Sequence, residues 1–347
     1  RREAYKNARY IVYCVRIGGL VGFEKDVEIP NGVYTGRIPS YSSQTSDVLM
    51  MTGASRNHGA ASFNCLYSMV LADPYASFVY VDFGLSLLQR RQLFSHFATI
   101  LQIQQKMKST GVLAYCQFDW DHFPSWFSLS ANPSQNGGYA WKVVSLVDVF
   151  FEWRAVVYWV DGGCVIREGI SRELSWTRHH GLFSPQSAGT VGTWVHPSAH
   201  EFMVKTGLLR GPVALEKGML SGGVLMLDFA NATIRDQLVP RYLVCAYTQK
   251  FISPRGTDRS NHRQDQAVLT LLAHDLGVAI GPPYFPATRV DGGGKRVLQN
   301  LLLKIQDVYS IRVSNRVMKT EKYERETFRH VSRPVDAEWV VHWGVCL

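Results

Sequence analysis

The sequence predicts an α/β fold built around a central, mostly parallel sheet that is flanked by helices. Short apolar runs of strand length alternate with longer segments in which apolar residues recur at helical spacing. Such alternation is typical of β-α-β crossovers, which place successive strands parallel in one sheet. A chain of 347 residues can bury the core of one large α/β domain or of two smaller ones.

The regular alternation occupies the first half of the chain. The predicted strands are the apolar runs 47–55, 77–85, 111–120 and 155–163. The predicted helices are 57–71, 86–108 and 141–153. Ser86 stands where a helix N-cap is expected, directly before the apolar positions of the second helix.

The second half is less regular. Residues 164–217 are rich in His, Trp, Ser and Gly and are expected to form a loop-dominated region. Pro240 is expected to interrupt the helix that contains it. The predicted elements are a strand at 219–229 and helices at 232–246 and 259–277.

No linker is long enough to separate two domains, so a single domain is expected. Residues 1–46 are predicted to be an N-terminal extension, 47–280 the α/β domain, and 281–347 a C-terminal part packed on the same domain. A Gly-rich turn is expected at 292–295.

Charge and cysteine usage narrow the classes of function. The formal charge is +9, which suits either a polyanionic ligand or simple solubility. The basic residues form scattered pairs such as Arg90-Arg91 and no long block, so nucleic acid is an unlikely partner. The six cysteines contain no CxxC pair, which argues against zinc ribbons and thioredoxin-like sites but leaves both disulfides and free thiols open.

Several common motifs are missing. The sequence has no GxSxG elbow, and no GxxxxGK[ST] or GxGxxG in a strand-to-helix context, so hydrolase, kinase and dehydrogenase functions lack support. His196 and His200 are four residues apart, but Pro197 follows the first and no glutamate lies between them, which argues against a zinc protease. No apolar run of about 20 residues is long enough to span a membrane.

Polar and small residues follow the predicted parallel strands. Ligands of open parallel sheets bind beyond the carboxyl ends of the strands. The residues at those ends are Thr52, Ala54, Ser55, Asn57, His58, Asp82, Asp119, Asp121 and Asp161.

Three stretches together resemble the nucleotide-sugar glycosyltransferases of the GT-A fold. They are YAWKVVSLVDVFFEWRAVVYWVDGG, LSGGVLMLDF and HRQDQAVLTLL. The resemblance covers roughly residues 47–275. The shorter stretches TGASRNH, YVDFGL and YAWK resemble a little-characterised eukaryotic group of such enzymes. The resemblance implies a single GT-A-like (Rossmann-like) domain, with 47–280 as its catalytic part, that moves a hexose from a nucleotide sugar to a hydroxyl acceptor.

The same resemblance assigns residues to roles. Asp265 and Gln266 are expected to be catalytic, and Asp161 to bind a divalent metal, Mn²⁺ or Mg²⁺, that offsets the charge of the leaving diphosphate. The residues expected to bind the donor nucleotide and sugar are Thr52, Ala54, Ser55, Asn57, His58, Asp82, Trp141, Lys142, Ser221, Gly222 and Gly223.

The metal assignment has open alternatives, because the family's Asp-x-Asp pattern is incomplete and its third position is Gly163. If Asp161 binds the metal, further ligands are expected among His196, His200, His274 and His342. One alternative is that the metal binds at Asp119 and Asp121, which form a literal Asp-x-Asp. Another is that Asp161 is only a turn residue. In a metal-free site, the phosphate charge is offset by Lys142, Arg154 or Arg263.

Other carboxylates also allow two interpretations. Asp82 either binds a ribose or base or caps the following helix, and Asp265 is either catalytic or stabilised by a helix dipole. Glu216 and Asp228 are weaker candidates for a general base.

The resemblance finally implies partners and a location. The expected donor is a UDP- or GDP-sugar, and the expected acceptor is a carbohydrate, protein or lipid held by aromatic segments at 118–126 and 176–200. A Golgi glycoprotein anchored upstream of this sequence is expected, and a sequon at Asn231 is compatible with that. The alternatives are a catalytically inactive binding protein for an anionic glycan or nucleic acid, and a transferase that modifies nucleobases.

Overall fold

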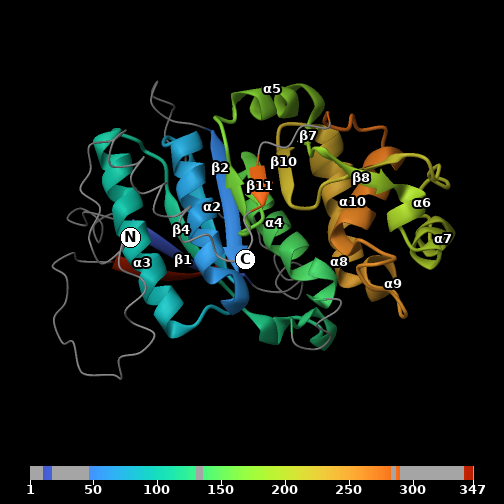
Figure 1. The fold of residues 1–347 in the computed structure, drawn as a ribbon, viewed down its shortest axis with the longest axis horizontal. Coiled ribbons are helices and arrows are strands. Elements are labelled where there is room, and N and C mark those ends of the chain that lie inside the picture. Colours follow the sequence, from blue (N-terminus) through green and yellow to red (C-terminus); the bar gives the residue numbers. More distant parts are fainter. Residues whose placement is uncertain (1–10, 18–46, 130–135, 283–286, 290–339, 347) are drawn as a thin grey trace, which may run out of the picture.

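The computed structural model describes residues 11–17, 47–129, 136–282, 287–289 and 340–346 (Figure 1). The Gly-rich turn predicted at 292–295 lies outside the described residues, as do most of 1–46 and 281–347.

The central sheet described here has eight strands. Six neighbouring strands, β12, β1, β4, β3, β2 and β5, run parallel. The two remaining strands continue from β5 as an antiparallel pair. The predicted α/β fold with a mostly parallel sheet is therefore confirmed. In spatial order the strands are β12 (Val340–Cys346), β1 (Ile11–Ile17), β4 (Leu113–Phe118), β3 (Ser77–Asp82), β2 (Val48–Ala54), β5 (Val156–Val160), β10 (Val224–Asp228) and β7 (Leu182–Phe183).

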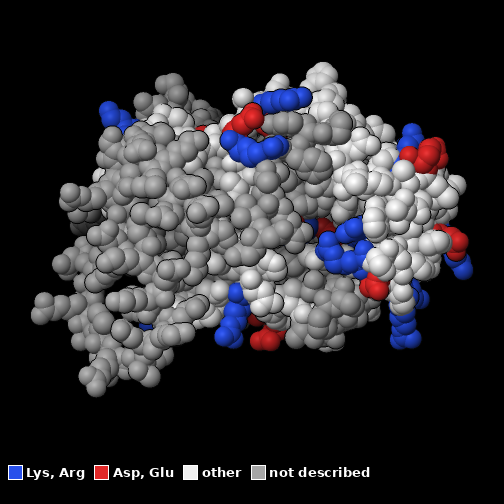
Figure 2. Space-filling view, viewed as in Figure 1, with Lys and Arg blue, Asp and Glu red and all other residues white. Residues whose placement is uncertain are grey.

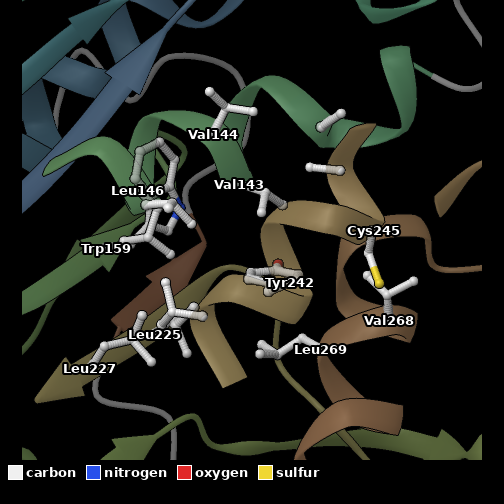
Figure 3. Packing of buried hydrophobic residues seen from close by; sticks show 14 of the residues in the cluster. Val143, Val144, Leu146, Trp159, Leu225, Leu227, Tyr242, Cys245, Val268 and Leu269 are labelled. Atoms are coloured by element: carbon white, nitrogen blue, oxygen red, sulfur yellow. The ribbon is translucent and has the colours of Figure 1, made fainter. Parts of the chain in front are cut away.

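Helices cover both faces of the sheet. Successive side chains of a strand point to opposite faces, so Met50 packs in one buried cluster and Met51 in another. The Met50 cluster contains α2 (Gly59–Ala72) and α3 (Leu87–Lys106), and the Met51 cluster contains α4 (Ala140–Trp153), α8 (Val239–Tyr247) and α10 (Gln264–Asp275). Figure 3 shows Val143 of α4, Tyr242 of α8 and Val268 of α10 in the second cluster.

The predicted start of α3 is confirmed in detail. The hydroxyl of Ser86 accepts a hydrogen bond from the backbone N–H of Gln89, and the Gln89 side chain accepts one from the N–H of Ser86. This reciprocal capping box satisfies two backbone donors that the helix itself leaves unpaired.

The prediction that residues 164–217 are dominated by loops is wrong for much of that range, which contains short helices and strands. The helix α5 was missed because the side chains that it buries, Glu173 and Thr177, are polar, so its sequence has no apolar period. The elements there, besides β7, are β6 (Cys164–Ile166), α5 (Ser171–His180), β8 (Gln186–Thr190), α6 (Val191–Trp194) and α7 (Pro197–Lys205).

Two further boundaries differ from the prediction. Pro240 does not interrupt a helix, because it lies in the first turn of α8, where a missing N–H costs no hydrogen bond. A π-helical turn, η5 (Ile234–Leu238), precedes it. The strand predicted at 219–229 is two strands, β9 (Gly218–Leu220) and β10, separated at Ser221 to Gly223.

Two other properties follow from the described residues. Cys65, Cys116, Cys164 and Cys245 carry free thiols. None of the helices in the described ranges is both long and apolar enough to cross a membrane.

A buried histidine should make stability depend on pH. His96 of α3 is 1% exposed and hydrogen-bonds through Nδ1 with the Tyr67 hydroxyl of α2 at 3.0 Å. Burial lowers the pKa of His96 to about 3. The unfolded chain takes up this proton below pH 6.5 and the folded chain does not, so stability is full above pH 6.5 and falls as the pH drops towards 3.

We expect His96→Gln to remove about 1.4 kcal/mol per pH unit from the slope of unfolding free energy against pH between 6 and 4. Urea denaturation of both proteins at several pH values measures this. Equal slopes would show that His96 titrates normally.

Candidate active site

Three charged side chains meet beside the carboxyl end of the central strand β5. Asp161 directly follows β5, Lys142 lies in the first turn of α4, and Asp265 lies in the first turn of α10. The loop between β9 and β10, which contains Gly222 and Gly223, passes over them. Lys142 and Gly222, which are 80 residues apart along the sequence, thus belong to one cluster.

Lys142 is the centre of this cluster. Its side-chain ammonium donates a hydrogen bond to the carbonyl oxygen of Gly222 at 2.8 Å, pairs with Oδ2 of Asp265, and lies 3.8 Å from Oδ1 of Asp161. Lys142 is only 5% exposed. Burial acts to lower its pKa, but the two carboxylates outweigh burial and raise the pKa, so the ammonium stays charged.

Asp161 is the exposed acid of the cluster. Oδ1 accepts a hydrogen bond from the indole N–H of Trp159 at 2.7 Å, and the backbone N–H of Asp161 donates to the carbonyl of Gly223 at 2.8 Å. The Asp161 side chain is 45% exposed, against 6% for that of Asp265. A ligand that reaches this edge of the sheet therefore meets Asp161 first.

Asp265 is the buried acid. Burial raises the pKa of its carboxyl above the ordinary value for aspartate, and Lys142 limits that rise. Gly222 lets the loop between β9 and β10 pack closely on Asp265, since a Cβ there would lie 3.3 Å from Oδ2 of Asp265 and 3.0 Å from Cβ of Gln266. The predicted grouping of Lys142, Gly222, Asp265 and Gln266 is thus found in the structure.

A turn with unusual backbone geometry leads into α4. Gly137, Gly138 and Tyr139 all have left-handed φ values, +59°, +62° and +57°. Such a φ is uncommon for a tyrosine. Tyr139 lies against Trp141, with ring centres 5.6 Å apart, and Trp141 in turn packs against Phe83 at 4.3 Å.

The two glycines after Asp161 have different surroundings. A Cβ on Gly162 would lie 2.9 Å from the carbonyl oxygen of Gly53 and 2.9 Å from Cβ of Ser62, whereas a Cβ on Gly163 would meet nothing within 4 Å. Gly162 is therefore required by packing against β2 and α2 rather than by a ligand. Gly163 opens onto free space.

This difference predicts opposite outcomes for two alanine variants. Gly162→Ala should lower the free energy of unfolding by about 1–3 kcal/mol, because the added methyl overpacks the end of β2. Gly163→Ala should leave stability within about 0.5 kcal/mol of the wild type. Denaturant unfolding measures both, and equal stability of the two variants would contradict this account.

The residues predicted at the end of β2 lie next to the cluster but differ in exposure. The close approach of Gly162 to Gly53 places the end of β2 beside Asp161. Thr52 and Ala54 are buried, Ser55 is half-buried, and Asn57 and His58 are exposed on the short helix η1 (Arg56–His58). Ser221 accepts a hydrogen bond from the N–H of Gly223 and so shapes the glycine loop.

Asp82 does not meet the requirement for a ribose or base ligand. Its Oδ1 accepts from the backbone N–H groups of Gly84 and Leu85, and its Oδ2 accepts from Arg90 and from the Tyr115 hydroxyl. Because both oxygens are engaged and the side chain is completely buried, the contacts argue against the donor-binding interpretation. The cap interpretation is wrong as well, because Ser86 caps α3 and Asp82 instead holds the turn at Gly84 and Leu85 that precedes it.

The other candidates from the sequence are engaged within the protein. Asp119 pairs with His122, and Asp228 pairs with Arg178. His200 accepts from the N–H of Val213, His274 contacts the carbonyl of Gly218, and His196 caps α7. Arg154 ends α4 and lies about 20 Å from Lys142 along that helix. The side chain of His342 lies outside what the structure describes.

The described residues do not fit a divalent metal at Asp161. Within the described ranges, no three His, Cys, Asp or Glu side chains come together in a way that could hold a metal ion. Asp161 has one carboxylate oxygen committed to Trp159, Asp265 is paired with the Lys142 ammonium, and Gly163 contributes no side chain. Mg²⁺ and Mn²⁺ need several oxygen ligands, and a neighbouring ammonium repels them.

Sequence reasoning missed Trp159, Tyr139 and Arg259. Trp159 orients Asp161, and Arg259 donates to the Tyr139 hydroxyl at 2.6 Å. Trp159 lies in β5 two residues before Asp161, which directly follows the strand. Because side chains two residues apart along extended chain point to the same face, strand alternation could have identified it. No sequence signal links Tyr139 to Arg259.

Comparison with known proteins gives similarity at the level of solved structures. No protein-family model matches the sequence, and no curated protein matches it. The bifunctional glycosyltransferase WbbM is similar with a TM-score of 0.42 and 13% identity over 73% of this chain and 41% of that one. Core-mannan synthase A from Aspergillus fumigatus, in its Mn/GDP form, gives 0.43 and 8% over 67% and 71%. Mouse xyloside xylosyltransferase 1 gives 0.39 and 12% over 68% and 83%.

This chain spans less than half of WbbM.

Proposed function

We propose that the chain is a glycosyltransferase that transfers a hexose from a nucleotide-sugar donor to a hydroxyl acceptor. The observation that carries the proposal is the cluster of Lys142, Asp161 and Asp265 at the carboxyl edge of a parallel sheet, of which Asp161 is exposed and the other two lie under the glycine loop. This edge is where open α/β sheets bind nucleotides. The cluster places a buried cation and two carboxylates beside that position.

The chemistry requires one bond to break and one to form. The bond between sugar C1 and a phosphate oxygen breaks, and the phosphate oxygen keeps the electron pair. The acceptor oxygen forms a new bond to C1, and its proton passes to a base. Positive groups that offset the charge of the leaving diphosphate, and a carboxylate that takes the proton, are therefore the two requirements.

The residues of this chain divide between these requirements. We assign proton acceptance to Asp265, because burial raises the pKa of its carboxyl in the direction of neutral pH. We assign contact with the sugar hydroxyls to Gln266 and Asp161. The donor nucleotide lies along the ends of β2 and β5, between Ala54, Ser55, Asn57 and the glycine loop. No step is assigned to Mn²⁺ or Mg²⁺, because the described donor set does not fit one.

The aromatic segment expected at 118–126 is partly core. Phe118 and Phe123 are buried and stack on each other, and Phe123 continues the stack to Phe127. These rings cannot stack on a sugar, whereas Trp120 and Trp126 of the same segment are partly exposed. We propose that the acceptor, a carbohydrate, protein or lipid, contacts these tryptophans or the partly exposed Trp194 of α6.

The location proposed is the lumen of the secretory pathway, in the Golgi, as the sequence resemblance implies. Endoglycosidase treatment of the protein from its native cells tests this, because the sequon at Asn231 is modified only in that compartment.

The first experiment is a panel of UDP-, GDP- and CMP-sugars tested by thermal shift and by release of nucleoside diphosphate or monophosphate. We expect one nucleotide class to raise Tm and to be released faster when an acceptor hydroxyl is supplied. Stabilisation without release towards any acceptor would favour the inactive binding protein. No stabilisation by any nucleotide would overturn the proposal.

A further inference from the structure

Three cationic side chains gather around Tyr139. The Lys142 ammonium lies 5.5 Å from the centre of the tyrosine ring, and the Arg259 guanidinium lies 5.4 Å from it while donating to its hydroxyl. Arg263, four residues further along, stacks on Trp194 at 3.9 Å and is close enough to Arg259 and Tyr139 to be affected by both. Two different elements, α4 and the segment before α10, supply these groups.

The two arginines carry charge that the described protein does not neutralise. Lys142 is paired with Asp265 and Asp161. Neither Arg259 nor Arg263 forms an ion pair with any carboxylate in the described part of the chain. Burial and the neighbouring Arg259 lower the pKa of Arg263, which is the sign expected when like charges are held together. An anion bound between them would relieve that repulsion.

The aromatic rings hold the arginines in place. Contact with Tyr139 and Trp194 orients the guanidinium groups. Arg259 uses one N–H on the Tyr139 hydroxyl, and a guanidinium has five N–H donors. Arginine in this state is suited to phosphate, which it can bind through two parallel hydrogen bonds. Figure 2 shows a group of basic side chains on the displayed face, in the region of α8 and α10, beside a hollow in the surface.

The backbone of Tyr139 supports a functional role for this arrangement. A left-handed tyrosine is unfavourable, and such strain persists where the surroundings enforce it. Here a Cβ on Gly137 would lie 1.9 Å from the carbonyl oxygen of Phe127, and one on Gly138 would lie 3.1 Å from Cβ of Ser253. The turn is thus packed tightly on both sides, and it holds the tyrosine ring between Lys142 and Arg259.

We propose that this site binds the diphosphate of the donor without a divalent metal, and that Arg259, Arg263 and Lys142 supply the positive charge. The inference rests on the proposed function. Arg259 and Arg263 contact the phosphate oxygens. The buried ammonium of Lys142 offsets part of the negative charge of the diphosphate. When the bond from C1 to the phosphate oxygen breaks, these three groups stabilise the electron pair that the diphosphate retains.

The test is isothermal titration of the full chain with UDP, GDP and pyrophosphate, each in EDTA and in Mn²⁺. We expect at least one nucleoside diphosphate to bind in EDTA with a Kd within about twofold of its value in Mn²⁺. Arg259→Gln and Arg263→Gln should each weaken that binding about tenfold, which is the loss of roughly one charge-assisted contact. Uridine and guanosine, which lack phosphate, should bind both variants as they bind the wild type.

Arg255→Gln is the matched control, since Arg255 is exposed on the same segment and is not part of the cluster. It should bind the diphosphates as the wild type does. All three arginines are at least partly exposed, so the variants are expected to fold, and their Tm values verify this.

Three outcomes would overturn the inference. Binding that requires Mn²⁺ would show that a metal takes the role given to the arginines, while the proposed glycosyltransferase function would stand. An equal loss in Arg255→Gln would show that general surface charge, not this site, attracts the anion. Absence of binding by every diphosphate under both conditions would overturn the inference together with the proposed function.

Discussion

Lys142→Met is expected to lower the free energy of unfolding by about 3–5 kcal/mol, the largest loss of stability predicted for a single substitution in this chain. The variant removes the ammonium but leaves the Asp265 carboxylate, whose side chain is 6% exposed, without a partner in the interior. An unpaired buried charge keeps its desolvation cost and loses the attraction that offset it. Asp161 contributes less, because its side chain is 45% exposed and water screens it.

A double variant separates charge from packing. Lys142→Met/Asp265→Asn removes both charges and should recover most of the loss seen in Lys142→Met alone. Lys250→Met, at an exposed lysine that lies over Phe202, is the control and should change stability by less than about 1 kcal/mol. Urea denaturation at pH 7 measures all three. A double variant no more stable than Lys142→Met would show that the lysine stem, not its charge, stabilises the site.

The sequence predicted the site where a general rule of parallel sheets applied. Asp161 could be placed at the edge of the sheet because an apolar strand ends there. That position needs only the period of the chain and the direction of its strands, whereas Lys142 and Asp265 were assigned to the site by the family resemblance. The parallel direction of β2, β3, β4 and β5 follows from the alternation of strands and helices, but their spatial order does not.

What the sequence could not predict depends on contacts between distant segments. Whether Asp82 is free or fully hydrogen-bonded is decided by Arg90 and Tyr115, which local patterns do not connect to it. The pairing of Arg259 with Tyr139 joins residues 120 apart. The need for a glycine at position 162 also depends on distant residues, because Gly53 and Ser62 fill the space that a side chain there would occupy.

The incomplete Asp-x-Asp pattern now has a physical explanation. Asp161 has no second carboxylate at position 163, but it has an ammonium 3.8 Å away and a further carboxylate, Asp265, beyond it. A lysine between two aspartates is itself a charge-balanced arrangement. The cluster therefore requires no metal ion to hold its two carboxylates close together.

Asp265→Asn is expected to lower kcat by about 10²–10⁴-fold, the loss typical of removing a general base, while the Kd for the nucleoside diphosphate changes little. Asparagine has the shape of aspartate, and Lys142 retains the carbonyl of Gly222 and the carboxylate of Asp161 as partners. A general base acts only in its deprotonated form, so we expect activity only when the carboxyl of Asp265 is deprotonated. Because burial raises the pKa of Asp265, the wild-type value of kcat/KM should fall as the pH drops through that raised pKa.

Asp161→Asn provides the matched comparison, since it makes the same chemical change at the exposed carboxylate of the cluster. We expect it to raise KM for the donor and to retain the fall of kcat/KM at acidic pH, whereas Asp265→Asn should lose that fall. Both variants are assayed over the same pH range. Unfolding curves recorded in parallel distinguish a loss of activity from a loss of structure. If Asp161→Asn loses the acidic limb and Asp265→Asn keeps it, the base is Asp161, and Asp265 serves only to hold Lys142 in place.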